Sequence, residues 1–109
     1  MNATATDIMV EQLVSEALDR LPDWILDVLA EVPVLVLDGG REAHAYGLYR
    51  GDGAAGRRAI DQIVVFRDTL IRDFGRDPRL LAAEVERTLR HEIAHHLGHS
   101  ERAVAALGL

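Results

Sequence analysis

The residues best suited to chemistry are concentrated late in the sequence. Four of the five histidines lie within residues 91–99, where His91, Glu92 and His95 form the pattern H-E-x-x-H. On a helix, side chains four positions apart share one face, with Cβ atoms about 5–6 Å apart. Two imidazoles at that spacing can reach one metal ion, and imidazole is a common zinc ligand. We therefore expect His91 and His95 to bind one zinc ion per chain.

Glu92 is the expected catalytic residue. It is rotated about 100° from His91 around the helix axis, so it stands beside the metal and does not bind it. A carboxylate at this place can take a proton from a metal-bound water, which then attacks a carbonyl carbon. The pattern therefore favours a hydrolase.

A third ligand is expected after Gly98. Hydrolytic zinc sites usually have three protein ligands and one position for water. Gly98 can end the helix in a left-handed turn that brings the chain back toward the metal, so Glu101 is the expected ligand. Glu101 could instead be a first-turn carboxylate of a final short helix. His99 is the competing ligand, because an unbroken helix would place it under His95.

The helix around the motif is expected to have separate polar and apolar faces. On a helical wheel, His91 and His95 lie within about 40° of each other, and the apolar residues from Leu81 to Leu97 lie at about 80–240°. His96 points into the apolar face, so we expect a packed, hydrogen-bonded core histidine. Other residues could take part in the site, but for each of them a structural or solvated role is at least as strongly favoured. These residues are Glu84, His44, Tyr46, Tyr49, Arg57 and Arg58.

Helices are expected at the start of the chain. Apolar residues from Val10 to Leu21 recur at helical spacing, and Thr6 or Asp7 can cap this segment. A second, short helix is expected over residues 23–31, because Pro33 removes a backbone donor and blocks the preceding turn.

Three apolar segments are expected to form strands. Residues 32–37 are too short for a helix and apolar almost throughout, which indicates a strand covered on both faces. Residues 46–50 and 60–66 are the other expected strands. The glycine-rich stretch 51–56 is expected to be a loop, because glycine at that density loses too much backbone entropy in regular structure.

Two more helices are expected after the last strand. Asp68 is placed to cap a short helix through Phe74, with Gly75 as a left-handed C-terminal cap. Asp77 and Pro78 predict the start of the long motif helix, because a capping carboxylate is followed by proline at the first helical position. This helix is expected to run from about residue 79 to residue 97.

The composition sets further bounds. A chain of 109 residues is expected to form one domain, residues 1–109. Without cysteine, disulfides, Cys-type zinc fingers and thiol nucleophiles are excluded. A net charge of −6 argues against a nucleic-acid partner, and no apolar stretch reaches the roughly 18 residues needed to span a membrane. Residues 1–10 do not resemble a secretory signal, so the default expectation is a cytoplasmic location.

Several segments together carry a family resemblance. They are Glu16–Pro22, Val34–Leu37, Gly47–Tyr49, Ile63–Phe66 and His91–Gly98. Over about residues 10–101 the chain resembles the zincin-like metallopeptidases, small bacterial proteins described as minimal zincins. The resemblance implies an α/β (α+β) fold with a small mixed sheet of about three to four strands, packed against N-terminal helices and the motif helix. It also implies that His91 and His95 are zinc ligands and that Glu92 is the catalytic base. No methionine follows Glu101, so a metzincin-type methionine turn is absent from this sequence.

Three functions can be weighed on these observations. The leading one is a zinc-dependent peptidase with a peptide or protein substrate, held as an added strand along a sheet edge beside the motif helix. For that edge the sequence suggests residues 60–66. The alternative is a non-catalytic zinc-binding interaction or regulatory module, but such a site has no use for a general base at Glu92. A metal-dependent endoribonuclease is disfavoured by the charge of −6.

Overall fold

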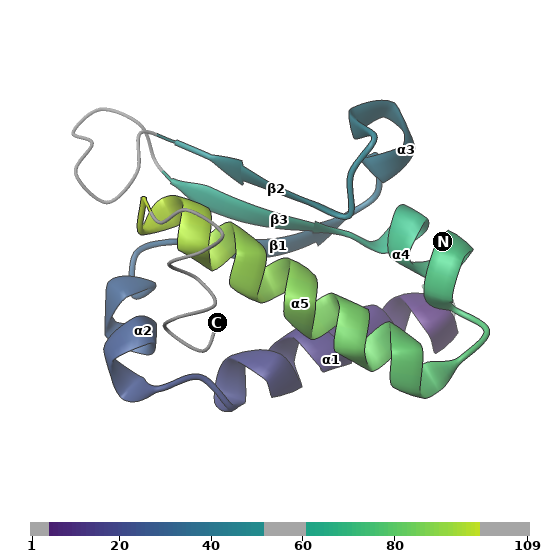
Figure 1. The fold of residues 1–109 in the computed structure, drawn as a ribbon, viewed down its shortest axis with the longest axis horizontal. Coiled ribbons are helices and arrows are strands. Elements are labelled where there is room, and N and C mark those ends of the chain that lie inside the picture. The colour runs from purple at the N-terminus through teal and green to yellow at the C-terminus, as the bar shows by residue number, and fades with distance from the viewer. Residues whose placement is uncertain (1–4, 52–60, 99–109) are drawn as a thin grey trace.

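The computed structural model describes residues 5–51 and 61–98. Within these residues the chain forms five helices and three strands. Figure 1 shows the sheet behind the long helix α5 (Pro78–His96), which crosses it diagonally, with α1 (Ala5–Asp19) packed alongside α5. The expected mixed α/β fold, with N-terminal helices and the motif helix against a small sheet, is confirmed.

The sheet has three strands in the order β1-β3-β2. The central strand β3 (Gln62–Phe66) pairs with β1 (Val34–Leu37) in parallel and with β2 (Gly47–Arg50) antiparallel. Residues 63–66 of β3 are buried, and Ile63 and Val65 pack in the clusters that the helices form with the sheet. Strand β1 is only half-buried and Leu37 at its end is exposed, so the expectation that this strand is covered on both faces is wrong.

The strand order also corrects the expected substrate edge. Both edges of β3 are used by β1 and β2, so residues 62–66 offer no free edge for an added strand. Ile60 lies outside the described residues. Strand β2 is an outer strand of the sheet, and it packs against α5. The edge beside the motif helix is therefore that of β2.

Three short helices connect these elements. Helix α2 (Asp23–Val28) precedes β1, and α4 (Arg67–Phe74) follows β3. Helix α3 (Gly40–Ala43) was not expected from the sequence. Its start follows Gly39, whose φ of 116° lies in the left-handed region that favours glycine.

Two local expectations around α4 are wrong. Asp68 does not cap α4. Its carboxylate instead accepts hydrogen bonds from the backbone N–H groups of Gly40, at 2.9 Å, and Arg41, at 3.3 Å, at the start of α3. Gly75 has φ −67° and ψ −13°, a right-handed conformation, so it is not a left-handed cap. The turn after α4 is instead continued by a hydrogen bond from the Asp77 N–H to the Phe74 carbonyl.

The core lies between the sheet and the helices. One buried cluster joins α1 and α2 to β3 and the second half of α5, and another joins α1 to β3, α4 and the first half of α5. Ile63 and Val65 of β3 belong to these two clusters, one to each, and both are fully buried. Among the helices of residues 5–51 and 61–98, none combines the length and the apolar character that crossing a membrane requires.

Candidate active site

Helix α5 begins and ends as its local sequence predicts. The Asp77 carboxylate accepts hydrogen bonds from the N–H groups of Arg79, at 3.0 Å, and Leu80, at 3.3 Å, and Pro78 occupies the first helical position. The helix ends at His96, and Gly98 adopts φ +76°, the expected left-handed conformation. Because both ends are fixed by local chemistry, the residues of the motif have a defined rotation about the helix axis.

His91 and His95 present their ring nitrogens to each other. The two Nε2 atoms are 3.0 Å apart and the ring centroids are 4.6 Å apart. Two zinc–nitrogen bonds of about 2.0–2.1 Å at a tetrahedral angle would hold the nitrogens about 3.4 Å apart, so a small movement of the rings would let both bind one ion. The pair is therefore a suitable donor set for zinc.

The other expected ligands cannot be placed. Glu101 and His99 lie outside the described residues. Within residues 5–51 and 61–98, no group of three or more metal-binding side chains is assembled. The described part of the chain thus brings together two imidazoles, those of His91 and His95.

Glu92 is buried next to this pair. Its residue is only 7% exposed, and this burial raises the pKa of the carboxyl group, while the nearby His95 and His91 lower it. A carboxylate with a raised pKa is a stronger base near neutral pH. Glu92 therefore has the position and the environment of a proton acceptor.

Gly47 allows β2 to approach α5 closely at this point. A Cβ atom there would lie 2.6 Å from Thr88 Cγ2 and 3.1 Å from Glu92 Cγ. Real Cβ contacts of 2.6 Å essentially do not occur, so any larger residue would push the strand away from the helix. The absence of a side chain at Gly47 therefore sets the distance between the sheet and Glu92.

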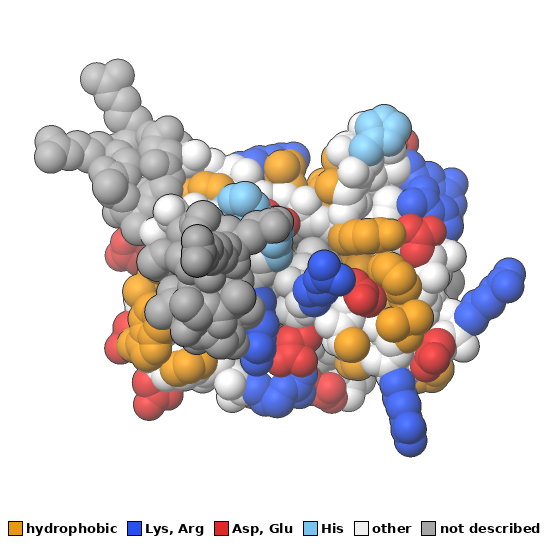
Figure 2. Space-filling view, viewed as in Figure 1, with side chains coloured by type: hydrophobic (Ala, Val, Ile, Leu, Met, Phe, Trp, Pro, Cys, Tyr) orange, Lys and Arg blue, Asp and Glu red, His pale blue; other side chains and the backbone are white. Residues whose placement is uncertain are grey.

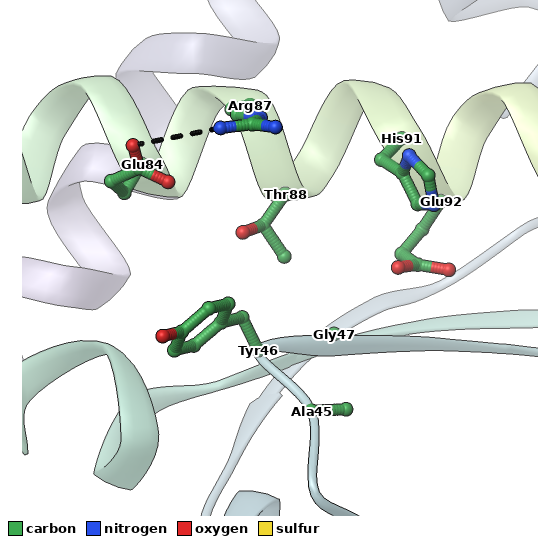
Figure 3. Close-up of a pocket in the computed structure, with 8 residues that line it drawn as sticks. All are labelled: Ala45, Tyr46, Gly47, Glu84, Arg87, Thr88, His91 and Glu92. Atoms are coloured by element: carbon green, nitrogen blue, oxygen red, sulfur yellow. Dashed lines mark ion pairs between the residues drawn. The ribbon is translucent and has the colours of Figure 1, made fainter. Parts of the chain in front are cut away.

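A cleft of about 350 Å³ opens beside Glu92. Figure 3 shows α5 as one wall, with Thr88 and Glu92 directed toward the opposite wall, which the segment 45–47 forms. The lining residues are Ala45, Tyr46, Gly47, Glu84, Arg87, Thr88, His91 and Glu92. Figure 2 shows that histidine side chains reach the molecular surface over the C-terminal half of α5 and near α3. The cleft thus opens His91 and Glu92 toward solvent.

His96 faces the interior, as its position on the helical wheel predicts. It is 4% exposed, and its Nδ1 lies 3.2 Å from the Tyr49 hydroxyl and 3.1 Å from Asp61 Oδ2. The residue therefore joins α5 to β2 and to the start of β3. The expected core role of His96 is confirmed, and the Tyr49 hydroxyl serves this network.

The weaker candidates are distributed around the cleft. Tyr46 and Glu84 line it, and the Tyr46 hydroxyl donates a 2.6 Å hydrogen bond to Asp73. His44 lines a separate, adjacent cavity of about 260 Å³ together with Arg41 and Arg72. Arg57 and Arg58 lie outside the described residues.

Sequence reasoning missed Thr88 and Gly47 as parts of the site. Thr88 lies four residues before Glu92, so helical spacing alone could have placed it on the same face. Gly47 carried no local signal, because its importance depends on a helix about forty residues away in the sequence.

Comparisons with known proteins agree with this geometry. A search of the curated proteins found no match. The family model for zincin-like metallopeptidases matches residues 27–109, a range that includes β1, β2, β3, the cleft and the whole of α5. Because this match spans most of the sequence, the chain belongs to the zincin-like metallopeptidase family.

Proposed function

We propose that the chain is a zinc-dependent metallopeptidase in which His91 and His95 bind the metal and Glu92 is the general base. The observation that carries this proposal is the 3.0 Å approach of the two Nε2 atoms beside a carboxylate that is 7% exposed. Membership in a metallopeptidase family supports the reaction class. A non-catalytic zinc-binding module would have no need for a buried carboxylate beside the histidine pair.

The metal site is completed by residues beyond α5. Glu101 is the proposed third ligand, with His99 as the alternative, and the left-handed turn at Gly98 supports a change of chain direction between them and the helix. A zinc ion held there would lower the pKa of its water and polarise the scissile carbonyl. His91 and His95 must both be neutral at Nε2 to bind it.

Glu92 moves the proton in the proposed reaction. Its carboxylate takes a proton from the attacking water and then donates that proton to the leaving amine. Burial, which raises its pKa, favours the first of these transfers.

The outer edge of β2 is the proposed substrate-binding strand. Its first residue, Gly47, lies against Thr88 and Glu92, so a peptide that extends the sheet at this edge would pass the catalytic carboxylate. Backbone hydrogen bonds to an edge strand bind peptides with little dependence on sequence. The peptide itself would then be held as a fourth strand.

The experiment that tests the proposal compares the wild type with Glu92→Gln. Zinc content and cleavage of a peptide library are measured for both proteins, each loaded with one equivalent of zinc. Both should bind one zinc ion, and only the wild type should cleave. Glu31→Gln, the same substitution at an exposed residue of the α2–β1 connection, serves as the control and should cleave normally. If both proteins bind zinc and neither cleaves, the site is a non-catalytic metal site and the proposal is wrong.

A further inference from the structure

The cleft extends beyond Glu92 toward the N-terminal end of α5, where Glu84 lines the same cavity as His91 and Glu92. Figure 3 shows Glu84 on the cleft side of the helix, above Tyr46. Glu84 and His91 are seven positions apart, which corresponds to about 10 Å along the helix axis. The cavity therefore connects the proposed catalytic centre with a second carboxylate.

The negative charge of the Glu84 carboxylate is poorly compensated within the protein. Its side chain is only 20% exposed, and its ion pair is a long one, 4.0 Å, to Arg87, whose side chain is 81% exposed. Within the described part of the chain, no hydrogen-bond donor reaches the Glu84 carboxylate. A mostly covered carboxylate that lacks a hydrogen-bond donor in the protein can accept one from a ligand.

Glu86, two residues further along α5, shows the contrast. It has a similar exposure, 28%, but it pairs with Arg90 at 2.9 Å and with Arg20 at 3.5 Å. Glu86 thus stabilises the contact between α1 and α5, whereas Glu84 makes no such contact and faces a cavity. Of the two carboxylates, Glu84 is therefore the one available to a ligand in the cleft.

The surroundings of Glu84 suit a cation. The Tyr46 hydroxyl is bound to the Asp73 carboxylate, and the charge of Glu84 also contributes to the raised pKa of Tyr46. Asp73 is itself paired with Arg72 at 2.8 Å, so Glu84 is the carboxylate near Tyr46 that faces the cleft. The ring of Tyr46 can contact the apolar part and the charged end of a long cationic side chain.

We propose that Glu84 determines the specificity of the cleft by binding a Lys or Arg side chain of the substrate, within two residues of the scissile bond. This inference rests on the proposed peptidase function. A peptide along β2 would bring its scissile bond to Glu92, and an extended Lys or Arg side chain from the same or the next residue can bridge the distance to Glu84. A charge-assisted hydrogen bond would then satisfy the carboxylate.

The test measures peptide binding and not turnover. Zinc-loaded Glu92→Gln protein is titrated with N-acetylated, C-amidated peptides that differ only in carrying Lys or the uncharged, linear norleucine, so no terminal charge contributes. The Lys peptide should bind about tenfold more tightly, as expected for one charge-assisted hydrogen bond. The preference for the Lys peptide should disappear when Glu84→Gln is added. With Glu84→Arg instead, a peptide that carries glutamate at the same position should bind best. Adding the exposed control Glu31→Gln should leave it unchanged.

Several results would overturn the inference. These are equal binding of the Lys and norleucine peptides, a Lys preference that survives Glu84→Gln, or no binding of any peptide. The norleucine peptide is also tested with a free N-terminal amine. If it then binds better than the acetylated Lys peptide, the Glu84 carboxylate binds the α-amine of the substrate, and the inference is contradicted. If the Lys preference is found and depends on Glu84 but the wild type cleaves nothing, Glu84 binds the cationic side chain as inferred and the proposed catalytic function fails.

Discussion

The two faces of helix α5 are built from opposite kinds of residues. Toward the core, Leu81, Val85, Leu89 and Ile93 are fully buried and make the contacts of both hydrophobic clusters. Toward the cleft, the residues are Glu84, Thr88, His91 and Glu92, of which Glu84 and Glu92 are carboxylates with little exposure to water. One helix therefore carries both the main packing surface and the candidate chemistry.

This difference shows how stability and chemistry can be combined in a small chain. The apolar face binds α5 to the sheet, and this attachment offsets the cost of burying carboxylates on the other face. Residues that are neighbours in sequence then have different roles because they are about 100° apart around the helix. Substitutions at adjacent positions should therefore separate folding from function.

The largest effects are expected at the adjacent pair Glu92 and Ile93. Ile93→Ala removes a fully buried side chain and should lower the free energy of unfolding by about 3–4 kcal/mol. Glu92→Gln should leave the metal-free stability unchanged or slightly higher, because the charged form of this carboxyl is disfavoured by burial. It should nevertheless reduce peptide cleavage by about a thousandfold. Urea unfolding and cleavage assays on both variants check this, and a large loss of stability in Glu92→Gln would contradict the division of roles.

His95 and His96 give the second comparison. His95 is exposed and approaches His91, so His95→Ala should abolish tight zinc binding and change the metal-free stability by less than about 0.5 kcal/mol. His96 is 4% exposed and bonded to Tyr49 and Asp61, so His96→Ala should cost about 2–3 kcal/mol. The folded His96 variant should keep its zinc. Zinc titration and thermal unfolding distinguish the two, and loss of zinc by folded His96→Ala would break the comparison.

Gly47 tests the opposite wall of the cleft. Gly47→Ala places a methyl group 2.6 Å from Thr88 Cγ2, so β2 and α5 must separate. Such overpacking should cost about 1–3 kcal/mol. Cleavage should fall by more than the stability loss explains, because Glu92 loses its position relative to the strand. Leu48→Ala is the control, because it shortens the next side chain of β2, which does not line the cleft, without crowding α5, and its cleavage should remain closer to that of the wild type.

Features that depend on neighbouring residues were predictable from the sequence. The start of α5 was correct because Asp77 bonds to N–H groups two and three residues later. The positions of His96 and of the apolar face of α5 followed from helical spacing, which fixes rotation about the axis. The three strands were found from their apolar runs, although their ends shifted by up to two residues.

Features that depend on distant contacts were not predictable in the same way. Asp68 seemed a local helix cap, but its donors lie 27 and 28 residues away in the sequence. The sheet order, which makes β3 central and β2 an edge, depends on pairing between separate segments. Predicting the cleft requires both the helical spacing within α5 and the distant contact of α5 with residues 45–47, because these two segments form its walls.

The smallest effect is expected from Asp68, which holds α3 and thereby the chain that leads to the cleft wall. Burial raises the pKa of Asp68, but hydrogen bonds from the backbone of Gly40, Arg41 and neighbouring residues outweigh this and lower it below its ordinary value of 3.8. A carboxyl group whose pKa is lower in the folded state stabilises the fold at pH values above its pKa in the unfolded state. This contribution is lost as the pH falls through the pKa of the folded state. Wild-type stability should therefore decrease below about pH 4.

Asp68→Asn should be less stable at pH 7 and should show a weaker decrease in acid, measured by urea unfolding across this range. Asp27→Asn, the same substitution at an exposed residue of α2, is the matched control and should show the same acid dependence as the wild type. An unchanged acid dependence in Asp68→Asn would show that the bonds to α3 do not stabilise this wall.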